Sequence, residues 1–347
     1  MNSTYSLLKD FNYPKTQKAI IIEQTGGPEV LKYADIAAPS LKELKPSEVI
    51  VKIKYSGINL IETYFRKGIY PVPLPYTLGR EASGKIVATG SNVSEFNLND
   101  YVVFLKPGSF CQYVKVDTST DKVINIGAEV SDEILKQYTA SMLQGLTALA
   151  FVEEAYPVKK GDYILNYAAA GGVGSILNQL LKLKGAHTIA VASTEEKLKI
   201  AVENGAEFTI LNDDPDFVNK IKSLTPGNAG TECIFDSIGK ETFENSLAIV
   251  KRKGTIISYG NASGPVEPLS INRLSAKNVK IARPQLFAYI TTPEEFEYYT
   301  SKLFKLISEK QISINIFDVF NLKDYSEATK LMEARKTTGK LVLEVPQ

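Results

Sequence analysis

The fold is decided by residues 163–185, which have the sequence YILNYAAAGGVGSILNQLLKLKG. An apolar run over 163–167 leads into a turn of small residues that ends at Gly174, and apolar residues then recur at helical spacing. A strand, a tight turn and a helix N-terminus in this order direct backbone N–H groups at a pyrophosphate, whose charge the helix dipole favours. The stretch therefore predicts the first unit of a dinucleotide-binding domain.

The small residues of this turn meet definite geometric needs. Gly171 allows close approach of the pyrophosphate, Gly174 lets the helix pack close to the sheet, and Ala169 stands where the fingerprint usually has its first glycine. Many tight turns contain glycines for backbone reasons alone. The strand before the turn and the helix after it favour the dinucleotide interpretation.

The second strand of the unit indicates which dinucleotide is bound. An NAD site normally has Asp or Glu about 20 residues beyond the turn, to accept from the ribose 2′-hydroxyl. Here the strand ends at Ser193 and Thr194, and no carboxylate stands at its end. Two hydroxyls with Lys197 on the next helix suit the 2′-phosphate of NADPH. The alternative is that Lys197 belongs to a solvated helix face beside Glu195 and Glu196.

Strands and helices alternate on both sides of this stretch. A long helix is expected after Ser131, and apolar strands at 188–192, 210–211, 232–236 and 255–259 alternate with helical stretches at 195–204, 216–224 and 242–250. Alternation of this kind predicts right-handed crossovers and a doubly wound parallel sheet. We assign residues 140–283 to this domain.

The residues outside 140–283 have a different sequence pattern. From Lys18 to about residue 130, short β-branched runs are separated by turn residues, and three prolines at alternate positions make 70–76 an extended loop. A helix at 325–335 and a strand at 340–345 complete this mostly β domain, which we assign to residues 1–139 together with 284–347. Residues 1–15 show no clear periodicity.

Composition restricts the chemistry. The 347 residues carry a formal net charge of +1, so nucleic acid is not the default partner. Two cysteines and one histidine exclude a disulfide framework and leave too few ligands for a zinc site of the His/Cys kind. No apolar run reaches the length of a membrane span, so we expect no membrane association and a cytoplasmic location, with a nuclear one left open.

Residues 78–90, LGREASGKIVATG, followed by Val93 and 99–102, resemble the medium-chain dehydrogenase/reductase family. The resemblance implies an α/β protein, with a Rossmann-type doubly wound parallel sheet plus a mostly β GroES-like catalytic domain. Zinc enzymes of that family surround the metal with a cysteine and a His-Glu pair. Here 55–59 contains no cysteine, and Arg80 replaces the histidine before Glu81. We therefore expect no metal.

Residues 59–71, NLIETYFRKGIYP, resemble the zeta-crystallin-type quinone oxidoreductases, and 283–287 and 335–341 are similar to a fungal member of that group. The resemblance implies zinc-free transfer of hydride or electrons from NADPH to quinones in the crevice between the domains. It also implies a homodimer, and weak binding of AU-rich RNA by some members. The cofactor-binding positions that it implies are Ala170, Gly171, Gly172, Val173, Gly174, Ser193, Lys197, Gly260, Asn261, Gln285 and Arg335.

We expect Asn59 and Tyr64 to be both catalytic and cofactor-binding residues, supplying hydrogen bonds near the nicotinamide and the substrate oxygen, and we expect Tyr70 to line the pocket. Among 18 tyrosines, amphipathic packing is the competing explanation for Tyr64. An NADPH-dependent 2-alkenal or enoyl reductase is the alternative activity. An AU-rich RNA-binding protein that has kept the dinucleotide fold is the alternative of another class, and an inactive structural protein is a third.

Other residues are expected to be structural. His187 is placed at a turn before the second strand, and Cys111 and Cys233 are predicted core residues. Glu81 is expected to bond the backbone or Arg80. Where relatives hold a ring near the adenine, this chain has Asn212-Asp213-Asp214. Dimerisation is expected through a sheet edge within 264–287.

Overall fold

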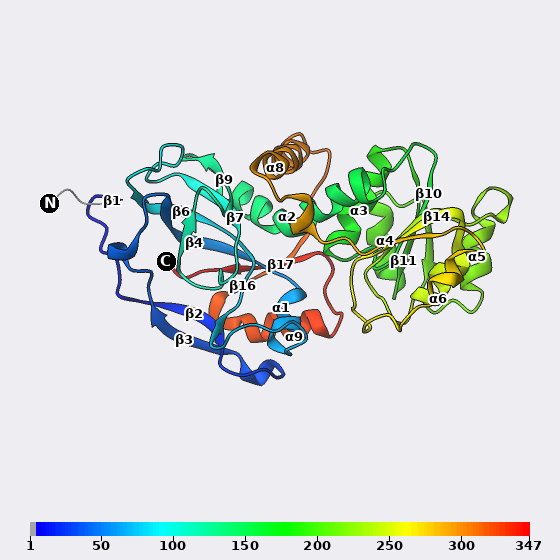
Figure 1. Ribbon diagram of the computed structural model, residues 1–347, viewed down its shortest axis with the longest axis horizontal. Coiled ribbons are helices and arrows are strands. Elements are labelled where there is room, and N and C mark those ends of the chain that lie inside the picture. The colour runs from blue at the N-terminus through cyan, green and yellow to red at the C-terminus, as the bar shows by residue number, and fades with distance from the viewer. Residues whose placement is uncertain (1–4) are drawn as a thin grey trace. The chain divides into compact units, whose positions relative to one another are not determined.

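The computed structural model describes residues 5–347, and Figure 1 shows the course of the chain. The chain forms two compact units. The first contains the residues up to Leu143 and Ile314–Gln347, and the second is Gln144–Ser313. The boundary predicted at 283/284 therefore differs from the observed one. Its cause is helix α8 (Pro293–Ser308), which belongs to the second unit because Tyr298 and Lys302 bond Glu153 and Tyr299 bonds Glu154.

The second unit is built on a six-stranded parallel sheet with the order β12-β11-β10-β13-β14-β15. The strands are β10 (Tyr163–Asn166), β11 (His187–Ala192), β12 (Phe208–Leu211), β13 (Thr231–Asp236), β14 (Val250–Ser258) and β15 (Lys280–Ala282). From β10 the chain first adds strands on one side of the sheet and then, from β13 on, on the other side. The carboxyl ends of β10 and β13 therefore mark the topological switch point, where such sheets bind ligands. The doubly wound sheet predicted from the alternation is confirmed.

Helices connect these strands: α3 (Gly172–Leu183), α4 (Glu195–Glu203), α5 (Phe217–Ser223) and α6 (Phe243–Ile249). Short 3₁₀ turns lie at Pro226–Asn228 and Ile271–Leu274, and α7 (Leu286–Tyr289) follows β15. α4 begins after Thr194, whose hydroxyl accepts the N–H of Lys197, and α8 begins with a capping box between Thr292 and Glu295. The core consists of apolar strand residues such as Leu165, Ile189 and Ile234.

The first unit contains an eight-stranded sheet and a three-stranded sheet. The larger sheet has β1 (Tyr5–Leu7), β4 (Glu48–Ile58), β6 (Glu81–Gly90), β7 (Tyr101–Leu105), β8 (Tyr113–Asp117), β9 (Lys122–Gly127), β16 (Ile316–Asn321) and β17 (Lys340–Glu344), and the smaller has β2 (Thr16–Ile22), β3 (Lys32–Ala37) and β5 (Tyr76–Thr77). Its helices are α1 (Ile61–Arg66) and α9 (Tyr325–Glu333), with 3₁₀ turns at Pro28–Val30, Leu41–Glu43 and Leu322–Asp324. Helix α2 (Asp132–Ala150) leads from this unit into the second and ends in a π-helical turn, Phe151–Ala155.

The C-terminal strand completes the first unit, as predicted. β17 pairs antiparallel with β4, with Leu341 opposite Ile58, and Figure 1 shows the two strands side by side although they lie far apart in the sequence. The structure also assigns a role to the segment before residue 15, from residue 5 on. β1 pairs with β6, and Phe11 and Tyr13 pack their rings against Tyr113. Among residues 5–347, no helix combines the length and the apolar character needed to cross a membrane.

Candidate active site

The turn between β10 and α3 is shaped to receive a phosphate. α3 is a helix of 12 residues that begins at Gly172, so its N-terminal N–H groups carry the positive end of the helix dipole. A Cβ on Gly174 would lie 2.3 Å from the carbonyl oxygen of Ala168 and 2.9 Å from the Cα of Ala169, so only glycine fits there. The N–H of Gly171 donates to Ala168 O at 2.9 Å and closes the turn. These residues fit a dinucleotide pyrophosphate.

Two buried asparagines brace this turn from behind. Asn178 Nδ2 donates to the carbonyl oxygen of Ala169 at 2.9 Å, and Asn166 Nδ2 donates to that of Gly174 at 2.9 Å. Asn166 Nδ2 also donates to Asn178 Oδ1 at 2.7 Å. Both side chains are fully buried. The one sequence signal for this pair is the presence of amides at positions where strand and helix periodicity place core residues.

The other predicted cofactor residues of the second unit follow its parallel strands. Ser193 follows β11, Gly260 and Asn261 follow β14, and Gln285 follows β15. Because the carboxyl ends of parallel strands share one edge, the fold brings these residues and the glycine turn to the same edge of the sheet. Gly260 must be glycine because a Cβ would lie 2.3 Å from the carbonyl oxygen of Ser237.

The end of β11 has the polar character that the sequence indicated. Ser193 and Thr194 are exposed, and Lys197 Nζ lies 3.5 Å from Ser193 Oγ. Lys197 is half-buried on the first turn of α4, with its Nζ directed toward the strand end rather than along the exposed helix face. This arrangement offers an ammonium and hydroxyls to a phosphate on the ribose.

The loop after β13 is organised by a buried carboxylate that the sequence analysis did not single out. Asp236 accepts the N–H groups of Ile238 at 2.8 Å and Gly239 at 3.1 Å, and the hydroxyl of Thr242. Burial raises the pKa of Asp236, while these hydrogen bonds oppose the rise. Asp236 thereby fixes the loop at the carboxyl edge, next to Gly260. Its position as the last residue of an apolar strand was the available signal.

Four predicted residues belong to the first unit. Tyr64 on α1 and Tyr70 after it are brought together, with ring centroids 5.4 Å apart in an edge-to-face arrangement, and both rings are half-buried. Asn59, between β4 and α1, is 2% exposed. Arg335 lies exposed just beyond α9 in a left-handed backbone conformation, with φ of 57°.

The two segments that frame the metal in zinc enzymes meet around an ion pair. Of the two partners expected for Glu81, the backbone is confirmed, because Glu81 accepts the N–H of Leu143 at 2.7 Å, and the charged partner is Lys340 rather than Arg80. Lys340 reaches this place because β17 pairs with β4, which puts Lys340 beside Asn59. Among residues 5–347, no cluster of His, Cys, Asp and Glu could hold a metal ion. The residues present do not fit a zinc site.

Helix α1 carries a buried acid. Glu62 is fully buried, and Oε2 accepts the N–H of Gly79 at 2.9 Å, while Oε1 has no hydrogen-bond partner among the described residues. Burial raises the pKa of Glu62 to about 7, against the opposing effects of the Gly79 N–H and Arg80. Glu62 is therefore protonated in part of the folded molecules at neutral pH.

Replacing Glu62 with Gln is expected to change the pH dependence of stability. Between about pH 4.5 and pH 7 the folded chain keeps a proton that the unfolded chain has released, so the free energy of unfolding falls as pH rises through this window. Glu62→Gln removes that loss and is expected to be more stable than the parent by about 3 kcal/mol at pH 8, but not at pH 4. Denaturant unfolding at both pH values measures this, with exposed Glu129→Gln as the control. Parallel pH curves for parent and Glu62→Gln would contradict the assignment.

The other residues singled out in the sequence pack against or bond their neighbours in the same unit. His187 begins β11, stacks on Tyr163 and lies 2.6 Å from Glu207 Oε2 through Nδ1. Cys111 and Cys233 are buried, and burial raises the pKa of Cys111 to about 12, so its thiol is unreactive. In the segment after β12, Asp214 pairs with Lys220.

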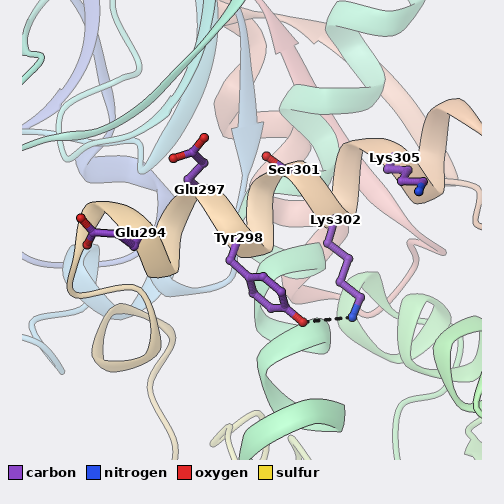
Figure 2. A pocket seen from close by; sticks show the side chains of 6 residues that line it. All are labelled: Glu294, Glu297, Tyr298, Ser301, Lys302 and Lys305. Carbon is purple, nitrogen blue, oxygen red and sulfur yellow. Dashed lines mark hydrogen bonds between the residues drawn. The ribbon is translucent and has the colours of Figure 1, made fainter.

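A surface hollow lies along α8 and is shown in Figure 2. Its lining comes from one helix face, with Lys302 Nζ donating to the Tyr298 hydroxyl at 3.2 Å. The lining residues are Glu294, Glu297, Tyr298, Ser301, Lys302 and Lys305. None of the predicted site residues is among them.

A doubly wound sheet with a phosphate-binding glycine turn, joined to a β unit whose metal ligands are replaced, defines a dinucleotide-dependent oxidoreductase without catalytic zinc. Residues 172–305 match the zinc-binding dehydrogenase family, and residues 45–140 match the alcohol dehydrogenase GroES-like domain.

Proteins that are similar to this chain over nearly its whole length identify the family within this class of oxidoreductases. A probable quinone oxidoreductase of Schizosaccharomyces pombe is 40% identical over 325 residues, covering 93% of this chain and 95% of that one. A 2-haloacrylate reductase of Burkholderia is 30% identical, covering 95% of this chain and 99% of that one. The solved structure of Escherichia coli quinone oxidoreductase complexed with NADPH superposes with a TM-score of 0.88 at 34% identity, covering 94% and 99% of the two chains. The chain belongs to the quinone oxidoreductases of the medium-chain dehydrogenase/reductase family.

Proposed function

We propose that the chain is an NADPH-dependent quinone reductase that works without zinc. The observation that carries the proposal is the pairing of Lys197 with Ser193 at the carboxylate-free end of β11, on the same sheet edge as the glycine turn. This edge offers positive charge where an NAD site has a carboxylate. The solved relative that binds NADPH supports the same cofactor.

The residues have distinct tasks in this proposal. The turn N–H groups from Ala170 to Gly174 hold the pyrophosphate, Ser193 and Lys197 hold the 2′-phosphate, and the positions after β14 and β15 orient the rest of the cofactor. When bound, NADPH supplies a hydride for transfer to the quinone. One quinone, one NADPH and one proton give one hydroquinone and one NADP⁺, and the proton comes from solvent.

Quinones suit a site that lacks a Lewis acid. The negative charge that develops on the acceptor oxygen is delocalised over the quinone ring, so hydrogen-bond donors are sufficient to stabilise it. We assign this role to the Tyr64 hydroxyl, with Tyr70 forming an aromatic wall beside it and Asn59 at the start of α1. The fit between a metal-free residue set and an easily reduced substrate supports the proposal.

Titration and turnover together test the proposed function. Fluorescence titration is expected to show tight binding of NADPH and much weaker binding of NADH, followed by NADPH oxidation on addition of 9,10-phenanthrenequinone. Elemental analysis is expected to find no stoichiometric zinc. Absence of NADPH binding, or a stoichiometric metal, would overturn the proposal.

Tyr64→Phe removes one hydroxyl and keeps the ring contact with Tyr70. Loss of one hydrogen bond to the developing oxyanion is expected to lower kcat for the quinone roughly tenfold, with the NADPH affinity nearly unchanged. Steady-state kinetics measures both, and Tyr33→Phe, on the surface strand β3, is the control. Unchanged quinone turnover would assign Tyr64 to packing.

A neighbouring activity is favoured by one comparison. The 2-haloacrylate reductase relative suggests that this scaffold can also reduce an activated carbon–carbon double bond. In that case Tyr64 or Tyr70 would donate the proton to the reduced carbon chain. Turnover of 2-hexenal beside 9,10-phenanthrenequinone separates the two activities.

A second copy of the chain and AU-rich RNA are proposed as partners because the chain resembles the zeta-crystallin-type quinone oxidoreductases. We propose a homodimer formed through β15, which is an end strand of the six-stranded sheet and presents an unpaired edge among the described residues. Light scattering after size exclusion measures the oligomeric state.

Weak AU-rich RNA binding stays a prediction, and competition between NADPH and RNA in a filter assay tests it.

A further inference from the structure

The neighbourhood that holds metal in zinc enzymes is filled here by a buried carboxylate. Glu81 is fully buried and points at the backbone of β4, where a Cβ on Gly57 would lie 2.2 Å from Glu81 Oε1. Glycine at 57 is therefore a condition for this position of Glu81. On its other side, Glu81 Oε2 accepts the N–H of Leu143 from α2 at 2.7 Å.

The cation in this neighbourhood is an ammonium. Lys340, the first residue of β17, is 3% exposed and donates to Glu81 Oε1 and to Asn59 Oδ1, the latter at 2.8 Å. Asn59 Nδ2 in turn donates to Glu81 Oε1 at 2.9 Å and to the carbonyl oxygen of Gly57 at 3.2 Å. We call Asn59, Glu81 and Lys340 the buried ionic cluster.

The chemistry of the cluster fixes the orientation of an amide. A lysine ammonium can only donate and a carboxylate can only accept, so the Asn59 oxygen must face Lys340 and its nitrogen must face Glu81. The carbonyl oxygen of Asn59 accepts the N–H of Glu62 at 3.1 Å, which attaches the start of α1 to the same point. Tyr64 lies on this helix.

Stability alone is a poor explanation for such a cluster. A buried ion pair loses about as much in desolvation as it gains in attraction, and apolar residues of similar shape are often equally stable. The ion pair of Glu81 and Lys340 holds the Asn59 amide and the start of α1 in place. Apolar residues at 81 and 340 could not do this, because they make no hydrogen bonds.

We propose that Lys340 is a positioning residue of the reductase: its ammonium and the Glu81 carboxylate hold the Asn59 amide, and the backbone of Asn59 in turn fixes the start of α1, the helix that carries Tyr64. The proposal rests on the proposed function. Asn59 acts in it as the link between the ion pair and the helix that carries Tyr64.

The variants are chosen so that the chain still folds. Lys340→Met alone would strand a buried carboxylate, so Glu81→Gln/Lys340→Met removes both charges together. Glu48→Gln/Lys115→Met is the matched control, because Glu48 is also buried, accepts a backbone N–H and pairs with a lysine of a neighbouring strand. Circular dichroism and thermal unfolding establish that each variant is folded.

A double-mutant cycle separates positioning from stability. Glu81→Gln/Lys340→Met is expected to lower kcat with the quinone at least tenfold, with NADPH affinity within twofold of the parent and the control pair unchanged. In an Asn59→Ala background the same double change is expected to lower kcat no further, because its effect passes through Asn59. Parent-like kcat in the double variant, or an additive loss in the Asn59→Ala background, would overturn the proposal.

Hydrogen exchange of the α1 amides tests the positioning role of Lys340 independently of quinone reduction. If the parent chain reduces no quinone, the proposed function fails, but exchange of the α1 amides can still be measured by mass spectrometry. Faster exchange in α1 of the double variant, with α3 unchanged, would support the positioning role. Unchanged exchange in α1 would overturn it.

Discussion

Gly174→Val is expected to weaken NADPH binding at least a hundredfold. The first carbon of the new side chain would lie 2.3 Å from the carbonyl oxygen of Ala168. That oxygen is held by the N–H of Gly171, and Ala169 O is held by the Asn178 amide. The turn must therefore open, and the N–H groups that hold the pyrophosphate lose their alignment. Because each hydrogen bond to a charged group contributes about 1.5–3 kcal/mol, loss of two raises the Kd at least a hundredfold.

Fluorescence titration measures the Kd in this experiment. Leu183→Val is the control, because it introduces the same side chain at the exposed last residue of the same helix. Gly174→Ala introduces the same Cβ contact but lacks the two γ carbons of valine, so its NADPH affinity is expected to fall between the two. If folded Gly174→Val bound NADPH with parental affinity, the glycine turn would not be the pyrophosphate site.

Lys197→Ala is expected to remove most of the preference for NADPH over NADH. Its ammonium would make charge-assisted bonds to the 2′-phosphate, which NADH lacks. Loss of one such contact is expected to weaken NADPH binding about 10- to 100-fold, with the affinity for NADH unchanged. Lys197→Glu is expected to extend the change, because a carboxylate repels the phosphate and can accept from a 2′-hydroxyl.

The neighbouring Lys199→Ala is the control for this prediction. Lys199 is exposed two residues further along α4, and residues at this spacing do not share a helix face. Raising the salt concentration should weaken NADPH binding more in the parent than in Lys197→Ala, since the contact is ionic. Equal loss of affinity for both dinucleotides in Lys197→Ala would contradict the phosphate role.

Much of the second unit was predictable because its determinants are local. The parallel strands are short apolar runs, the helices have apolar periodicity, and the glycine at 174 is demanded by atoms only a few residues away. Residues placed after the strands come to one edge as a consequence of parallel pairing alone. The carboxyl-edge positions therefore required no long-range information.

The buried ionic cluster could not be predicted in this way. Glu81 and Lys340 are separated by 259 positions, and each by itself is a charged residue in a strand-like run. Only the pairing of β17 with β4 brings them together. The domain boundary was misplaced for the same reason, because the contacts that place α8 in the second unit join Glu153 and Glu154 to residues 145–149 positions later.

The placement of β17 between β16 and β4 also constrains how the protein is made. During synthesis, the whole second unit leaves the ribosome before β17, the strand that completes the larger sheet of the first unit. Throughout that time, the part of β4 that pairs with β17 lacks its partner strand. At roughly 5–20 residues per second, Glu81 is without its counter-ion for some tens of seconds of synthesis. The sheet of the first unit can therefore be completed only after the whole second unit has been synthesised, and a nascent chain truncated before Lys340 would hold a carboxylate with no ammonium to neutralise it.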